Sequence, residues 1–181
     1  MKPELDPAQT LAHWEEQEAQ RRRTMLTSGV ARAEQVAGLT GMQIFERMFA
    51  GELPYPPIGE TLDFLLIEVE PGRSVFQGRP LLRHYNPLGT VHGGVIATLL
   101  DTAAGCTVHS TLPAGVGYTS LDLMTRFIKP VTIDSGLLRC EGGIISRGRR
   151  TAVAESHLYD GRGKLLAHAT STCLIFELPQ A

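Results

Sequence analysis

One stretch of the sequence is best suited to catalysis. It contains a histidine followed by two glycines, and an aspartate stands eight residues after the first glycine. It spans residues 86–101 and reads NPLGTVHGGVIATLLD. His92, Gly93 and Gly94 stand where a helix is predicted to begin. The first amides of a helix have no partner within it and lie at the positive end of its dipole, so they can polarise a carbonyl oxygen or hold an oxyanion. The alternative is that the two glycines only allow close packing of the helix.

Asp101 lies two turns into the same predicted helix, among apolar neighbours. A carboxylate there is costly unless it is hydrogen-bonded or functional, which makes it a candidate catalytic group; an aspartate that faces solvent or caps a loop is the alternative. Gly93 and Asp101 are separated by about 12 Å along a helix axis, and catalytic contacts need about 3 Å. If both act, each must therefore meet its counterpart across a two-fold axis, which predicts a homodimer or homotetramer.

A sheet must position this helix. The helix is predicted over residues 91–109, where apolar and small residues alternate around Leu99 and Leu100. One buried helix with an antiparallel sheet around it is an α+β arrangement. The predicted strands cover residues 63–70, 73–79, 117–128, 136–146, 151–159 and 164–176.

The first third of the chain, residues 1–52, is predicted to be a helical extension with a linker. Its long helix, 7–27, follows a capping signal at Asp6 and has a thin apolar face with Leu11 and Trp14. Isolated helices of this length are marginal in water, so it needs a partner. We expect it to pack on a neighbouring subunit.

Two further features belong to this extension, and a third directly follows it. The arginines 21–23 stand beside glutamates and predict a solvated helix face rather than a phosphate site. A second helix is predicted over 40–50, where apolar residues recur at helical spacing and Gly51 suits the C-terminal cap. Prolines stiffen the segment 53–58, which is predicted to be an extended linker.

Composition excludes several classes of function. The 181 residues include 17 basic and 19 acidic ones, a net charge of −2 that argues against nucleic-acid binding. Three cysteines without C-x-x-C spacing argue against a disulfide scaffold and a zinc site, and the six histidines have no metal-ligand spacing. No apolar stretch approaches the ~20 residues of a membrane helix, and the polar N-terminus lacks the pattern of a secretory signal. We expect a cytoplasmic protein that contacts no membrane.

Several separated segments resemble, in the same order, the PaaI-type hotdog-fold acyl-CoA thioesterases. The resemblance covers about residues 53–177 and implies a hotdog domain over 53–181, with an antiparallel sheet wrapped around one long helix. It also implies hydrolysis of an acyl- or aroyl-CoA thioester to the free acid and CoA, without metal or cofactor. The segments are PPIGETLDF, HYNPLGTVHGGVIATLLDTAAG, GYTSLDLMTRFIKPVT and SRGRRTAVAESHLYDGRGKLLAHATSTCLIF.

The resemblance also implies roles for residues at matching positions. The amide of Gly93 would donate to the thioester carbonyl, and Asp101 of the other subunit would be the nucleophile or the base for water. Asn86 would lie near the reacting carbonyl or water. His92 would support the loop at the helix start, and Ser120 would position water.

Basic residues at predicted turns are candidates for binding the phosphates of CoA. Gly94 at the helix start is a further candidate for substrate binding. A solubilising rim is the alternative for the basic residues. These candidates are Lys129, Arg147, Arg149 and Arg150.

Other interpretations stay open from the sequence. The chain could be another hotdog enzyme, such as an enoyl-thioester hydratase or dehydratase, or a non-catalytic acyl-CoA-binding regulator. Cys106 and His109 stand one helical turn apart, but no third residue orients the histidine, so core packing is favoured over a cysteine nucleophile. The helix over 40–50 is expected to lie over the mouth of the substrate cleft and help form the acyl pocket.

Overall fold

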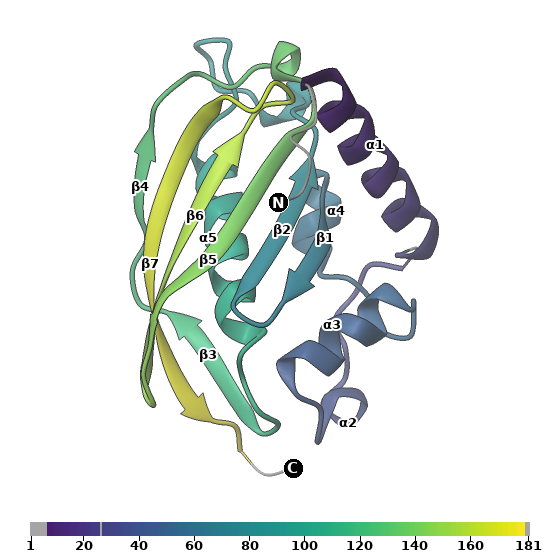
Figure 1. Ribbon diagram of the computed structural model, residues 1–181, viewed down its shortest axis with the longest axis vertical. Helices are drawn as coiled ribbons and strands as arrows, with labels where there is room; N and C mark the ends of the chain where they lie inside the picture. The colour runs from purple at the N-terminus through teal and green to yellow at the C-terminus, as the bar shows by residue number, and fades with distance from the viewer. Residues whose placement is uncertain (1–6, 26, 180–181) are drawn as a thin grey trace.

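A computed structural model describes residues 7–25 and 27–179, so the capping signal at Asp6 lies outside the described residues. In the described part of the chain, a curled antiparallel sheet wraps around helix α5, and the N-terminal helices lie beside its β1 end (Figure 1). The elements in chain order are α1 (Pro7–Thr24), α2 (Ala33–Val36), α3 (Gly41–Phe49), α4 (Pro57–Leu62), β1 (Phe64–Glu70), β2 (Arg73–Gly78), the single turn η1 (Leu82–His84), α5 (Gly93–His109), β3 (Val116–Ser120), β4 (Met124–Phe127), the single turn η2 (Ile133–Ser135), β5 (Leu138–Arg147), β6 (Thr151–Tyr159) and β7 (Leu165–Glu177).

The strands lie in the order β1-β2-β5-β6-β7-β3, and β4 also pairs with β7. Each pairing is antiparallel. The predicted α+β arrangement, one long helix inside an antiparallel sheet, is therefore confirmed. The boundary between an extension (1–52) and a hotdog domain (53–181) stays a prediction.

Small residues let α5 lie directly on the sheet. A Cβ on Gly142 of β5 would stand 2.6 Å from the carbonyl oxygen of Ala103, so only glycine fits where the helix backbone touches the strand. The hydroxyl of Ser74 on β2 donates to the same carbonyl at 2.9 Å. Leu100 and Ala103 are fully buried. This contact fixes the helix that carries both predicted catalytic positions.

The single strand predicted over 117–128 is wrong, because the structure divides it into β3 and β4. Ser120 pairs with Cys173 and Met124 with Thr170, so three residues on this side face two on β7. An extra residue of this kind bends a strand and interrupts its hydrogen bonds. The backbone amide of Thr172 instead donates to the side chain of Asp122 at 2.9 Å.

Helix α1 packs on the sheet of its own chain, so the expectation that it packs on a neighbouring subunit is wrong for the contacts described. Cys140 on β5 faces α5, since its thiol lies 3.7 Å from the carbonyl of Leu99. The adjacent Arg139 therefore points to the opposite face. There its guanidinium donates to Gln17 of α1 and stands 5.0 Å from the centre of the Trp14 ring.

Charged side chains hold α1 against the sheet, because its apolar face is too thin to do so alone. Glu18 is 3% exposed and accepts hydrogen bonds from Arg22 of its own helix and from Arg79 at the end of β2. Arg21 donates to the carbonyl of Ile67 in β1 at 3.0 Å. The prediction that the three arginines form a solvated face is therefore wrong for Arg21, which is half-buried against the sheet. Arg22 and Arg23 are exposed, and Arg22 bonds Glu18 of the same helix and Asp63.

The second predicted helix is confirmed as α3, and Gly51 takes the left-handed conformation (φ +76°) just after its end. The segment 53–58 is only partly extended, because α4 begins at Pro57. Proline suits the first position of a helix, where its missing N–H would have no partner. The described residues contain no helix that is both long and apolar enough to cross a membrane.

Candidate active site

The start of α5 uses one amide for its own cap and leaves another available. The ring nitrogen Nδ1 of His92 accepts a hydrogen bond from the amide of Gly94 at 2.9 Å. Within the described residues, the amide of Gly93 has no hydrogen-bond partner. Because it lies in the first turn of a 17-residue helix, this N–H can donate to an external oxygen at the positive end of the dipole.

A loop organised by Asn86 leads into this helix. The side-chain oxygen of Asn86 accepts from the amide of Leu88 at 2.9 Å, and its nitrogen donates to the hydroxyl of Thr90 at 3.0 Å. Gly89 completes the turn with φ +82°. Both polar atoms of the Asn86 side chain therefore bond within the loop and hold its shape.

Asn86, Gly93 and Lys129 line one hollow of about 320 Å³ at the surface. Phe127 of β4 forms part of its wall, and a Cβ on Gly93 would lie 3.1 Å from the Phe127 ring. Three of the predicted site residues are therefore brought together. Phe127 was not predicted, because nothing in the sequence indicates which strand residue covers the start of the helix.

Asp101 and Ser120 form a second group on the same helix and the neighbouring strand. The hydroxyl of Ser120 on β3 donates to the carboxylate of Asp101 at 2.9 Å. Both residues are half-buried. Since α5 is continuous from Gly93, Asp101 lies about 12 Å along it from the available amide, and one chain does not bring the two groups together.

The arginines of the β5–β6 turn form a third group. Arg147, Arg149 and Arg150 line a separate surface hollow with Glu177. Arg147 donates to the hydroxyl of Thr111 at 2.8 Å, just beyond the C-terminal end of α5. These arginines therefore lie at the opposite end of the helix from Gly93 and Lys129.

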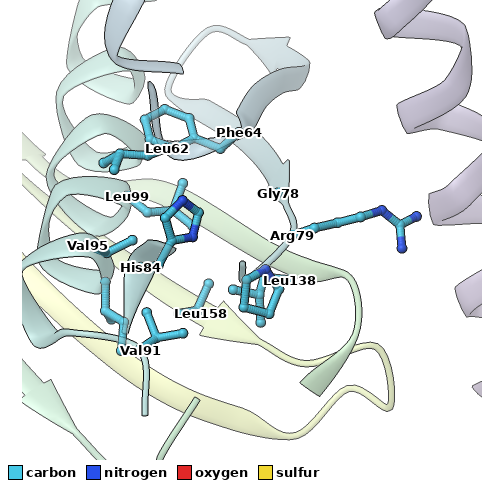
Figure 2. Close-up of a pocket in the computed structure, with 12 residues that line it drawn as sticks. Leu62, Phe64, Gly78, Arg79, His84, Val91, Val95, Leu99, Leu138 and Leu158 are labelled. Atoms are coloured by element: carbon cyan, nitrogen blue, oxygen red, sulfur yellow. The ribbon is translucent and has the colours of Figure 1, made fainter. Parts of the chain in front are cut away.

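A buried histidine that was not predicted supports the helix start. His84 lies among apolar side chains such as Val95 and Leu99 (Figure 2), and its carbonyl accepts from the amide of His92 at 2.8 Å. Its Nδ1 accepts from the amide of Leu81. Burial and the charge of Arg83 lower the pKa of His84. The residue belongs to the HYNPLG segment, but its role depends on burial, which the sequence does not reveal.

Comparison with known proteins identifies the family. Residues 88–167 match the model of the thioesterase superfamily. A crystal structure of a phenylacetic acid degradation-related protein of Ralstonia eutropha JMP134, named as a candidate thioesterase, is 32% identical with a TM-score of 0.66, and the match covers 72% of this chain and 98% of that one. The chain belongs to the thioesterase superfamily. This thioesterase has the hotdog fold, as predicted.

Two curated relatives extend the comparison of this thioesterase. The medium/long-chain acyl-CoA thioesterase YigI of Escherichia coli K12 is 28% identical over 160 residues, which are 82% of this chain and 99% of that protein. A candidate esterase of Halobacterium salinarum is 36% identical over 77 residues, 41% of this chain and 49% of that protein. The match with YigI is longer than the hotdog domain predicted over residues 53–181.

The surroundings of Cys106 favour core packing over a cysteine nucleophile in this thioesterase. Burial raises the pKa of the Cys106 thiol to about 12, so it holds its proton at neutral pH. Burial also lowers the pKa of His109. A thiolate is the reactive form of cysteine, and a neutral buried thiol is inert.

In the described part of the chain, no group of three His, Cys, Asp or Glu side chains is placed to hold a metal ion.

Proposed function

We propose that the protein hydrolyses an acyl-CoA thioester to the free acid and CoA. The observation that carries the proposal is the available amide of Gly93 at the start of the helix that also bears Asp101. An amide at that position stabilises the negative charge that develops on the thioester oxygen. Asp101, oriented by Ser120, is then the nucleophile or the base. The acyl-CoA part of the proposal is supported by the name of the relative YigI.

The reaction follows one of two balanced routes. In the first, the Asp101 carboxylate attacks the thioester carbon, the C–S bond breaks, and CoA leaves as a thiolate; water then cleaves the mixed anhydride and restores the carboxylate. In the second, Asp101 takes a proton from a water molecule as that water attacks the same carbon, and the proton passes to the departing sulfur. Both routes need the Gly93 amide at the carbonyl oxygen.

We infer that each site takes Gly93 from one subunit and Asp101 from another. The 12 Å rise between them supports this arrangement. So does the apolar surface beside Gly93, because soluble monomers seldom expose adjacent large apolar side chains. On the edge formed by β4 and the residues flanking it, Leu121, Met124, Phe127 and Ile128 are 44–59% exposed. A homodimer, alone or within a tetramer, covers that edge.

The other predicted residues take supporting roles in this proposal. His92 caps α5 and holds the first turn in place, and Asn86 shapes the loop beside the reacting carbonyl. Lys129 in the same hollow is suited to a phosphate of CoA. The amide of Gly94 is already bonded to His92, so its contribution is to the cap.

The three arginines of the β5–β6 turn are proposed to bind CoA from the other end of the shared site. Arg147, Arg149 and Arg150 line one hollow. A two-fold axis between antiparallel α5 helices would bring this end of one subunit toward the Gly93 end of the other. A cytoplasmic location stays a prediction.

Thiol release from a panel of CoA thioesters tests the proposal. We expect the wild-type chain to release CoA, and Asp101→Asn to keep its fold but lose at least ~10²-fold in turnover, the effect of one acid–base group. Asp122→Asn is the matched control, since Asp122 lies on the nearby surface and its accepting oxygen is retained. Near-wild-type turnover by Asp101→Asn, or no thiol release by the wild type, would contradict the proposal and favour an acyl-CoA-binding regulator or another hotdog enzyme.

A further inference from the structure

We propose that an apolar cavity between the N-terminal helices and α5 binds the acyl chain of the substrate, and that this chain is of medium length. The inference rests on the proposed thioester hydrolysis and gives it a substrate class. The cavity has a volume of about 310 Å³, within the range of about 300–1,000 Å³ that small-molecule sites occupy.

The walls of the cavity come from both parts of the chain. Thr102 and Cys106 of α5 form one side, and Ile44, Phe45 and Met48 of α3 line it as well. The segment 54–59 and strand β1 complete it. A ligand in this cavity therefore contacts the extension and the helix of the proposed catalytic aspartate at the same time.

Asp101 does not line the cavity, but two of the residues that do stand close to it in the chain or on the neighbouring strand. Thr102 directly follows Asp101 along α5. On β3, Tyr118 and Ser120 are two residues apart and point to the same face. Ser120 binds the Asp101 carboxylate, whereas Tyr118 lines the cavity. An acyl chain whose carbonyl meets Asp101 can therefore continue into the cavity.

The lining has the chemistry of a hydrocarbon site. The described lining residues include no Asp, Glu, Lys or Arg. Cys106 and His109 are both neutral at neutral pH, because burial raises the pKa of the thiol and lowers that of the imidazole. The cavity thus offers an uncharged, mostly apolar surface, and burial of a methylene group there is favourable by about fourfold in affinity.

The size of the cavity indicates the chain length. A cavity of about 310 Å³ lies at the lower end of the range for small-molecule sites, which suits an acyl chain of medium length. Val30 and Ile58, which are 83% and 42% exposed, mark the end of the lining that reaches the surface. Longer chains must pass these residues.

A substitution that fills the cavity tests the inference. Ala31 lines the cavity and is half-buried. Ala31→Phe should therefore lower kcat/KM for decanoyl-CoA at least tenfold. The phenyl ring would displace several methylene groups of the substrate, and each contributes about fourfold to affinity. Hydrolysis of acetyl-CoA should change less than twofold. Ala50→Phe is the matched control, because Ala50 is exposed at the end of α3 and is absent from the lining.

Binding of the non-hydrolysable thioether S-decyl-CoA separates this inference from the proposed reaction. Calorimetry should show at least tenfold weaker binding to Ala31→Phe than to Ala50→Phe. If the wild type binds the thioether in this way but hydrolyses no thioester, the proposed reaction fails and the cavity assignment stands. Equal losses of kcat/KM at all chain lengths, or unchanged thioether binding by Ala31→Phe, would overturn the cavity assignment while hydrolysis stands.

A second variant covers the case in which Ala31→Phe does not fold. Val30 is exposed, so Val30→Trp should leave the fold intact and narrow the surface end of the cavity. We expect kcat/KM for palmitoyl-CoA to fall at least fivefold while that for hexanoyl-CoA stays within twofold. The same loss for both substrates would overturn the inference.

Discussion

The first turn of α5 uses its amides in two different ways. His92 accepts from Gly94 and closes the helix end, whereas the amide of Gly93 keeps no partner within the described residues. A backbone amide is fixed by the helix itself, so its donor needs no reorganisation when charge develops on a carbonyl oxygen. Gly93 contributes only its backbone to this role, so a substitution can remove the amide N–H without removing any side-chain contact.

Replacing Gly93 by proline tests that amide directly. Proline suits the first helical position, and the preceding His92 already has the extended ψ of 135° that a following proline requires. Gly93→Pro should therefore fold normally but lose about 10²–10³-fold in kcat, as expected for one oxyanion donor. Steady-state kinetics with decanoyl-CoA measures the loss.

The control is Gly93→Ala, which keeps the amide and adds only a Cβ, 3.1 Å from the Phe127 ring. It should retain kcat within about tenfold, because the ring can move by a few tenths of an ångström. Similar losses in both variants would mean that space at this position matters and the amide does not.

Some site residues follow from the sequence and others do not. Gly93 and Asp101 stand out because glycines at a helix start and a carboxylate in an apolar helix are both unusual. His84 and Phe127 do not, since one acts through burial and a backbone carbonyl and the other through the position of a strand edge. Neither burial nor the position of a strand edge can be recognised from the spacing of nearby residue types.

Helix α3 is attached to α5 at one close contact. The amide of Gly41 donates to the carbonyl of Leu112 at 3.0 Å, and a Cβ at Gly41 would lie 1.8 Å from the carbonyl oxygen of His109. Any larger residue must push the two helices apart. This contact holds one wall of the proposed acyl cavity against α5.

Gly41→Ala should therefore loosen α3. We expect the free energy of unfolding to fall by about 1–3 kcal/mol, the usual effect of overpacking, and kcat/KM for decanoyl-CoA to fall more than that for acetyl-CoA. Urea unfolding and kinetics measure the two effects. Gly143→Ala is the control, because nothing lies within 4 Å of a Cβ there; equal behaviour of both variants would show that the contact is unimportant.

Elements with strong periodicity were predictable. Helices α1, α3 and α5 follow from helix formers and apolar spacing, and the hairpins follow from turn residues. The division between β3 and β4 was not, because it depends on one extra residue opposite β7. The docking of α1 was not either, because its contacts are ion pairs and hydrogen bonds with residues far along the chain, such as Glu18 with Arg79 and Gln17 with Arg139.

Across the whole molecule, a network of charges joins α1 to the outer face of the sheet. Glu68 of β1 accepts from Arg139 of β5, from Arg73 of β2 and from Gln17 of α1. Burial alone would raise the pKa of Glu68, but these hydrogen bonds outweigh it and bring the pKa to about 2. The ionised carboxylate therefore links three elements.

This network predicts how stability depends on pH. Because the pKa of Glu68 is lower in the folded chain than its ordinary 4.5, its ionised form stabilises the fold above that value. The contribution is lost as pH falls from about 4.5 toward 2. Urea unfolding of Glu68→Gln should show a smaller decrease in stability over this range than the wild type. Glu70→Gln, at the exposed end of the same strand, should behave like the wild type; an unchanged slope in Glu68→Gln would refute the prediction.

The central claim is a hydrolytic site shared by two subunits, and mixing two inactive variants measures it most directly. Gly93→Pro lacks the donor and Asp101→Asn lacks the carboxylate. After subunits exchange in an equal mixture, half of the dimers are mixed, and one of the two sites in each carries neither lesion. We expect recovery of about a quarter of wild-type thiol release. No recovery despite demonstrated exchange would contradict it, because a site built within one chain is damaged in every subunit.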